Sequence, residues 1–244
     1  MRLTEFEIIS IVESFKHHFA SGDIYLFGSR VDDTKKGGDI DLYIDTADNV
    51  DLFDKKLLLA RDIKAKIGEQ KIDIIISKDK DLAIEKEALK KGVKLDIKKL
   101  KQVKIINECE KHLQRLQYAK EKLSRLFPLT QQDYGNLSPE DIQAIDQFIY
   151  RFSKLQDTIG EKLIKIVFSL YEENVEKFTF VDILNRLEKA EILTAQTWKE
   201  LRDIRNELSH NYEDDPMENT IILNKVYEKE EALELIYKNI KERL

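Results

Sequence analysis

The chain has 244 residues, of which 42% are hydrophobic, 36% are charged and only three are proline. This composition is typical of a soluble, helix-rich protein with one large or two ordinary domains. The net charge is −6 and neither half of the chain is strongly basic, which excludes a broad basic platform for nucleic acid. The single cysteine, Cys109, excludes an internal disulfide.

The hydrophobic pattern also bears on membrane association. The longest apolar runs fall far short of the roughly 20 residues that span a bilayer. No signal-peptide pattern opens the chain. We therefore expect a cytoplasmic protein without a membrane partner.

The first hundred residues predict a small α/β domain. Apolar residues at helical spacing indicate a helix over residues 4–19, with Thr4 as its N-cap. Alternating or β-rich runs then predict strands near 24–28, 39–45 and 71–76, with helices over 51–68 and 82–91. We assign residues 1–98 to this domain.

Beyond residue 101 the pattern is helical throughout. Charged amphipathic stretches predict five helices, at roughly 101–127, 138–174, 179–190, 195–211 and 222–243. Strong breakers occur at residues 128–139 and at Pro216. We expect residues 102–244 to form an all-α bundle, joined directly to the first domain because no glycine- or serine-rich linker separates them.

Acidic residues cluster in the segment GSRVDDTKKGGDIDLYID, residues 28–45. Asp39 and Asp41 are two apart on a predicted strand, so both side chains leave the same face. Paired carboxylates repel each other unless a cation lies between them, and Mg²⁺ prefers such ligands together with substrate phosphates. Asp73, on the next predicted strand, can join the pair. Three convergent carboxylates can hold two metal ions for an in-line phosphoryl displacement.

Gly28 and Ser29 end the first predicted strand where a phosphate would be held. Glycine lets the backbone approach an anion, and serine offers a hydroxyl and an N–H. Arg30 can add positive charge. The alternative is a surface hairpin whose acids face water. The combination of strand, Gly-Ser, Asp-x-Asp and a later Asp favours a metal and nucleotide site.

This segment resembles the minimal nucleotidyltransferase domain of the DNA polymerase beta superfamily, which carries a GS-x(n)-D-x-D signature and a third Asp on a following strand. The resemblance implies that Asp39, Asp41 and Asp73 are the catalytic, magnesium-binding residues, and that Gly28 and Ser29 hold a nucleoside triphosphate. It implies transfer of a nucleoside monophosphate to a hydroxyl with release of pyrophosphate. The signature does not fix the base; we expect ATP.

A second polar cluster, RNELSHNYEDD, spans residues 205–215. Residues five apart lie about 140° around a helix, so Arg205 and His210 do not stack and one copy makes a poor site. Two copies across a twofold axis would form a cationic pocket for a phosphodiester, with His210 as general acid or base. The alternative is a polar helix end, with Arg205 paired to an acid and His210 as a cap.

The cluster resembles the R-x4-H-x-Y motif of HEPN domains, helical bundles found beside minimal nucleotidyltransferases. That resemblance implies a homodimer with a latent, metal-independent ribonuclease at Arg205 and His210. It also implies that the nucleotidyltransferase adenylylates Tyr212 and so silences RNA cleavage. The two domains usually form a toxin–antitoxin pair of separate chains, whereas here they are fused.

Two other functions remain open. One is a small-molecule nucleotidyltransferase of the aminoglycoside-modifying type, for which the acidity suits a polycationic substrate but the R-x4-H-x-Y motif has no purpose. The other is a nucleotide-binding regulator without turnover, which has little need of three carboxylates. His17, His18 and His112 lack partners in the sequence, and we expect ordinary surface or core roles for them.

Overall fold

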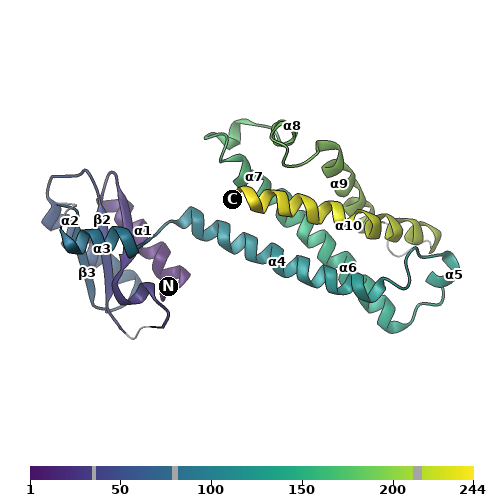
Figure 1. The fold of residues 1–244 in the computed structure, drawn as a ribbon, viewed down its shortest axis with the longest axis horizontal. Coiled ribbons are helices and arrows are strands. Elements are labelled where there is room, and N and C mark those ends of the chain that lie inside the picture. The colour runs from purple at the N-terminus through teal and green to yellow at the C-terminus, as the bar shows by residue number, and fades with distance from the viewer. Residues whose placement is uncertain (35–36, 79–81, 211–215) are drawn as a thin grey trace. The chain divides into compact units, whose positions relative to one another are not determined.

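The computed structural model describes residues 1–34, 37–78, 82–210 and 216–244. The chain divides into two compact units, Met1–Lys101 and Gln102–Leu244 (Figure 1). Within the described ranges, no helix is long and apolar enough to cross a membrane.

The first unit is built on a small mixed sheet in the order β3-β2-β1-β4. Its strands are β1 (Asp23–Phe27), β2 (Ile40–Asp45), β3 (Ile72–Ile76) and β4 (Val93–Lys94). β1 is antiparallel to both of its neighbours, β2 and β4, and β2 is parallel to β3. The three predicted strands lie within one residue of their expected bounds. β4 was not predicted because two residues are too few to show a period.

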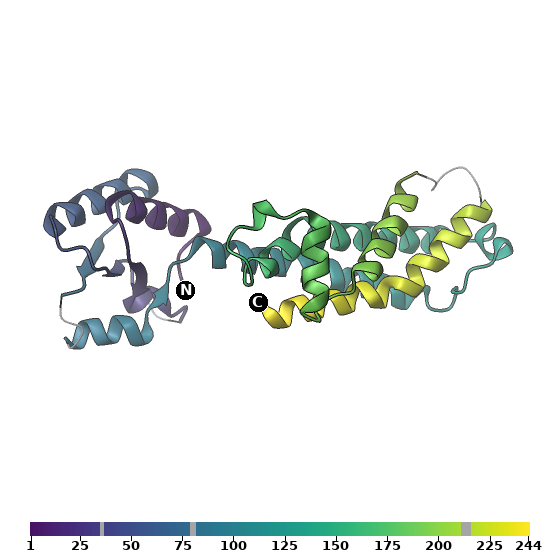
Figure 2. The same ribbon diagram turned by 90° about the horizontal axis from the view of Figure 1, so that it is seen from above.

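Helices cover both faces of this sheet. Figure 2 shows α1 (Glu5–His18) and α2 (Leu52–Ile67) on one side and α3 (Ala83–Lys91) on the other. On β2, the alternate residues Ile40, Leu42 and Ile44 are buried in the core that α1 and α2 share. Tyr43 points the other way and packs with Ala88 of α3. Because side chains alternate along a strand, Asp41 shares the face of Tyr43.

The start of α1 is fixed by a capping box, which confirms Thr4 as N-cap. The Thr4 hydroxyl accepts a hydrogen bond from the Glu7 N–H at 3.2 Å, and the Glu7 carboxylate accepts from the Thr4 N–H at 2.7 Å. Such a reciprocal pair satisfies backbone donors that the first helical turn leaves free. The same box orients the carboxylate of Glu7, which contacts the loop after β1 (below).

In the described part of the second unit, all regular secondary structure is helical. Its helices are α4 (Ile97–Leu123), α5 (Gln131–Tyr134), α6 (Pro139–Thr158), α7 (Ile164–Phe168), α8 (Phe180–Lys189), α9 (Ala195–His210) and α10 (Pro216–Arg243). The helix predicted over 138–174 is continuous from Pro139 but ends earlier, at Phe168, and it contains a π-helical turn at Ile159–Leu163 between α6 and α7. α10 begins at Pro216 rather than near residue 222, since proline fits the first helical turn.

The helices α4 and α10 run antiparallel to each other (Figure 1). Lys241 pairs with Glu110 near one end, and Lys120 pairs with Glu230 towards the other at 2.7 Å. Glu230 is itself buried, with a side chain 1% exposed. The apolar sides of the long helices form one continuous core.

Candidate active site

Three carboxylates gather at one end of the parallel strand pair β2–β3. Asp41 of β2 lies directly beside Asp73 of β3 in the register of the sheet. Asp39 immediately precedes β2 and, being two residues before Asp41, shares its face. The side chains of Asp39 and Asp73 are 45% and 57% exposed, whereas Asp41 is partly buried. The structure thus brings together the three aspartates that the sequence singled out.

Lys71 is a member of this cluster that the sequence analysis missed. Its Nζ lies 2.6 Å from Asp39 Oδ2 and 3.4 Å from Asp73 Oδ2. Hydrogen bonds to Asp39 and then to Asp73 raise the pKa of Lys71, so the ammonium stays charged. The signal was available, because Lys71 is two residues before Asp73 and therefore shares its face.

The turn after β1 packs tightly against Asp41. Phe27, the last residue of β1, is the register partner of Asp41 on β2. Gly28 follows with φ +71°, and a Cβ built on it would lie 2.1 Å from Asp41 Oδ2. Glycine is needed here for two separate reasons: the left-handed backbone and the close approach of the carboxylate.

The N-terminal residues hold the turn and the following loop. Arg2 donates hydrogen bonds to the carbonyl oxygens of Ser29 and Gly37, both at 3.0 Å. Its own N–H donates to the Arg30 carbonyl at 2.7 Å. The Ser29 hydroxyl lies against Gly37, where a Cβ would come within 2.2 Å of Oγ. Arg2, which the sequence did not single out, therefore links the Gly-Ser turn to the Gly37-Gly38 segment.

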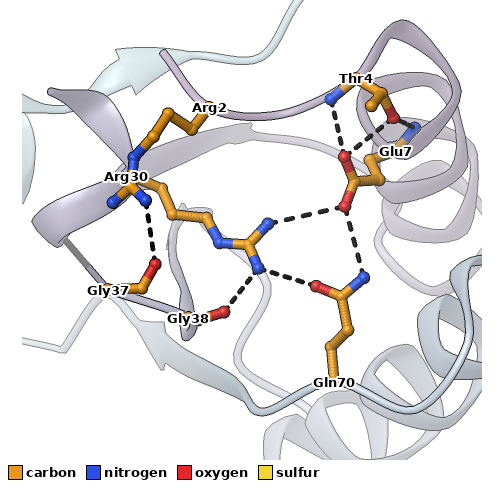
Figure 3. A network of polar contacts seen from close by, with 7 residues as sticks. All are labelled: Arg2, Thr4, Glu7, Arg30, Gly37, Gly38 and Gln70. Atoms are coloured by element: carbon orange, nitrogen blue, oxygen red, sulfur yellow. Dashed lines mark hydrogen bonds and ion pairs between the residues drawn. The ribbon is translucent and has the colours of Figure 1, made fainter. Parts of the chain in front are cut away.

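Arg30 belongs to the same network, shown in Figure 3. Its guanidinium donates to the Gly38 carbonyl and to Gln70 Oε1, the latter at 2.8 Å, and lies 3.5 Å from the Glu7 carboxylate. The side chain is only 14% exposed. This geometry gives Arg30 a positioning role in the loop that leads to Asp39, in addition to its electrostatic effect on Asp41.

The electrostatics of Asp41 favour a bound cation. Burial raises the pKa of this carboxyl, and the neighbouring charges of Asp73 and Asp39 raise it further, against smaller lowering effects of Lys71 and Arg30. Like charges at close range disfavour ionisation of the Asp41 carboxyl. Their oxygen atoms are hard donors of the kind that Mg²⁺ prefers, and an ammonium already bridges two of them. The residues therefore fit a divalent cation bound together with phosphate oxygens.

The second predicted cluster is only partly within the described residues. Arg205, on α9, forms a two-point ion pair with Asp157 of α6, with Nε–Oδ1 and Nη2–Oδ2 distances of 3.0 Å. The sequence gave no signal for Asp157 as a partner. The side chain of His210 and the whole of Tyr212 lie outside the described part of the chain. Their predicted arrangement stays a prediction.

A pocket of about 480 Å³ opens beside Arg205. It is lined by basic, acidic, amide and aromatic side chains, among them Asp157, Glu161, Lys165, Trp198, Arg202, Arg205 and Asn206. The π-helical turn forms part of its wall, because a Cβ on Gly160 would lie 2.8 Å from Trp198 Cζ2. Helical segments of this kind are frequent at functional sites.

The convergent carboxylates and the Gly-Ser turn beside them fit a site for phosphoryl transfer with bound metal ions. Consistent with this, residues 10–102 match the family model described as Polymerase beta, Nucleotidyltransferase. The match spans Gly28, Ser29 and all three aspartates, and it supports placing the N-terminal domain in the nucleotidyltransferase superfamily. It does not extend over the helical unit beyond residue 102. Comparison with curated proteins and with solved structures gave no match.

Proposed function

We propose that the protein is a magnesium-dependent nucleotidyltransferase that uses ATP and transfers AMP to a hydroxyl group. The observation that carries this proposal is the half-buried carboxylate of Asp41, packed against Gly28 and flanked by Asp39 and Asp73. Magnesium held by these three carboxylates would neutralise charge on the triphosphate. The turn of Gly28 and Ser29 supplies backbone N–H groups and a hydroxyl for the phosphate oxygens.

In the proposed reaction the acceptor oxygen attacks the α-phosphorus. The new O–P bond forms in line as the bond from that phosphorus to the pyrophosphate oxygen breaks. The proton of the acceptor hydroxyl passes to the carboxylate cluster, where Asp73, the more exposed of the two outer aspartates, is best placed to receive it. Arg2 and Arg30 keep the loop between the turn and Asp39 in one conformation.

For the acceptor we propose Tyr212, two residues beyond His210 in a HEPN-like bundle fused to the transferase. The bundle would form a homodimer in which paired Arg205 and His210 cleave RNA. AMP on Tyr212 would add bulk and negative charge beside these residues and block an RNA phosphate. The pocket beside Arg205, with Arg202 and Lys165 in its wall, supports an anionic ligand at this position. The ion pair of Arg205 with Asp157 must open, or be shared, for such binding.

Intact-mass spectrometry tests the transfer. The protein is incubated with Mg²⁺ and each nucleoside triphosphate in turn, and peptide mapping locates any adduct. We expect the mass of AMP on the peptide that contains Tyr212. Asp41→Asn should abolish the adduct, and Asp54→Asn, which removes an exposed carboxylate elsewhere in the same unit, should leave it unchanged.

Separate measurements distinguish the rival functions. A thermal shift produced by aminoglycosides, with an adduct on the drug and none on the protein, would favour a small-molecule transferase. Nucleotide binding without any adduct would favour a regulator without turnover. RNA cleavage should be low in the intact protein, rise when Asp39 and Asp41 are neutralised, and vanish again when His210→Ala is added. A monomer at micromolar concentration by light scattering would contradict the dimeric nuclease.

A further inference from the structure

Two histidines and an aspartate meet on the helices that cover the opposite face of the sheet from the carboxylate cluster. His17 and His18 end α1, and Asp62 lies on α2. One potential ligand atom from each residue lies within 4.8 Å of those of the other two. The set brings together residues 44 positions apart, which no sequence pattern indicated.

The backbone at the end of α1 brings the imidazole rings of His17 and His18 close together. Consecutive residues on a helix project about 100° apart, so neighbouring histidines seldom act together. Here α1 ends at His18 and Phe19 is already extended, with φ −117° and ψ 127°. The two rings lie edge to face with their centroids 4.9 Å apart.

Asp62 is oriented as a ligating carboxylate would be. Its Oδ1 accepts hydrogen bonds from Arg61 Nε at 3.0 Å and Nη2 at 2.8 Å. Its Oδ2 lies 2.7 Å from His18 Nε2. Metal-ligating carboxylates are commonly held by such a second hydrogen bond on the other oxygen.

Burial differs across the set in a way that leaves one side open. The His18 side chain is 10% exposed and that of Asp62 is 27% exposed, whereas the side chain of His17 is exposed and forms no hydrogen bond to any residue that the structure describes. All three therefore meet at the edge of the α1–α2 interface, where an ion can enter and keep a water ligand. The carbonyl end of α1 adds a favourable partial negative charge.

We infer that His17, His18 and Asp62 form a binding site for a divalent transition metal, zinc in the first instance. Two imidazole nitrogens and one carboxylate oxygen are a donor set that suits zinc, with water as the fourth ligand. The ion would enter between His18 Nε2 and Asp62 Oδ2, which need to separate by only about 0.6–0.7 Å to reach the spacing of two ligands at 2.0–2.1 Å in a tetrahedron. Bound there, it ties the C-terminus of α1 to the middle of α2.

Thermal unfolding of the full-length protein with zinc tests the site. Asp41→Asn serves as the background, because it weakens the carboxylate cluster as a competing metal site. In this background we expect saturating zinc to raise the unfolding midpoint by several degrees, roughly 5 °C or more. His17→Ala should remove the rise while preserving the fold, since His17 is exposed. His112→Ala, which removes a histidine of the helical unit, should retain it.

Cobalt gives a readout that does not depend on stability. Co²⁺ bound by two imidazoles and a carboxylate in tetrahedral geometry should give visible d–d absorption, displaced by an equal amount of zinc. The band should be lost in His17→Ala and in Asp62→Asn. An equal zinc response in His17→Ala, or a protein that shows neither a zinc shift nor a cobalt band, would overturn the inference and leave His18–Asp62 as an ion pair alone.

Discussion

Replacement of Gly28 by alanine tests both reasons for a glycine in this turn, the left-handed backbone and the close approach of the Asp41 carboxylate. An L-residue in the left-handed region costs about 1–2 kcal/mol, and in a domain of this size each kcal/mol lowers the unfolding midpoint by about 4–8 °C. The new Cβ would also lie 2.1 Å from Asp41 Oδ2, so the carboxylate has to move by roughly 1 Å. A displacement of that size at a reacting centre can reduce the rate about 10²-fold.

Two other glycines of the same unit provide matched controls. Gly68 has φ +88°, and a Cβ there would meet no atom of the described residues within 4 Å, so Gly68→Ala introduces strain without a clash. Gly38, in the loop that Arg30 holds, has neither a positive φ nor a described atom within 4 Å of a built Cβ. Gly68→Ala should lower the midpoint with transfer intact, and Gly38→Ala should change neither.

The assay measures pyrophosphate release against magnesium concentration, with thermal unfolding on the same samples. Gly28→Ala should show both defects, and the loss of transfer should exceed the loss of folded protein at the assay temperature. Wild-type transfer by Gly28→Ala at an unchanged magnesium requirement would refute the placement of Asp41 at the reacting centre.

Other substitutions probe single charges. Asp41→Asn should reduce transfer on the order of 10²-fold or more. Because the pKa of Asp41 is raised in the folded protein, its ionised carboxylate lowers the free energy of unfolding, so without metal at neutral pH the variant should have a higher unfolding midpoint than wild type. This difference in midpoint should disappear as the pH falls through the folded-state pKa. Lys71→Met should lower the magnesium concentration for half-maximal transfer by about two- to fivefold, whereas a fall in transfer at unchanged magnesium requirement would assign Lys71 to phosphate binding. In the helical unit, Lys120→Met leaves a buried carboxylate unpaired and should cost about 3–5 kcal/mol in chemical denaturation. Lys238→Met, which removes a lysine whose side chain is 58% exposed, should cost much less, and equal costs would contradict this reading.

The sequence predicted the aspartate cluster because strand periodicity determines which side chains share a face. Asp39 and Asp41 are two apart, and the parallel pairing of β2 with β3 then places Asp73 beside them. The same rule would have placed Lys71 in the cluster. It says nothing about Arg2 or Glu7, whose contacts depend on how the N-terminal segment packs against a loop some 30 residues away.

The helical unit shows a different limit of sequence reasoning. Amphipathic periodicity located the long helices but not the π-helical turn at Ile159–Leu163, because five residues are too few to show a separate period. Nor does periodicity choose partners, so Asp157 could not be assigned to Arg205. Similarly, His17 and His18 looked isolated because their neighbour Asp62 comes from another helix.

Comparison of two carboxylates, the half-buried Asp41 and the buried Glu230, distinguishes a functional acidic residue from a structural one. Burial raises the pKa of both. Glu230 lies 2.7 Å from Lys120 inside a helix–helix contact, so its charge is compensated within the fold. Asp41 instead has Asp39 and Asp73 as neighbours, and the close packing of Gly28 limits its movement away from them. The repulsion among these three carboxylates destabilises the metal-free protein, and a divalent cation bound between them would relieve it. For this reason we place the chemistry at Asp41.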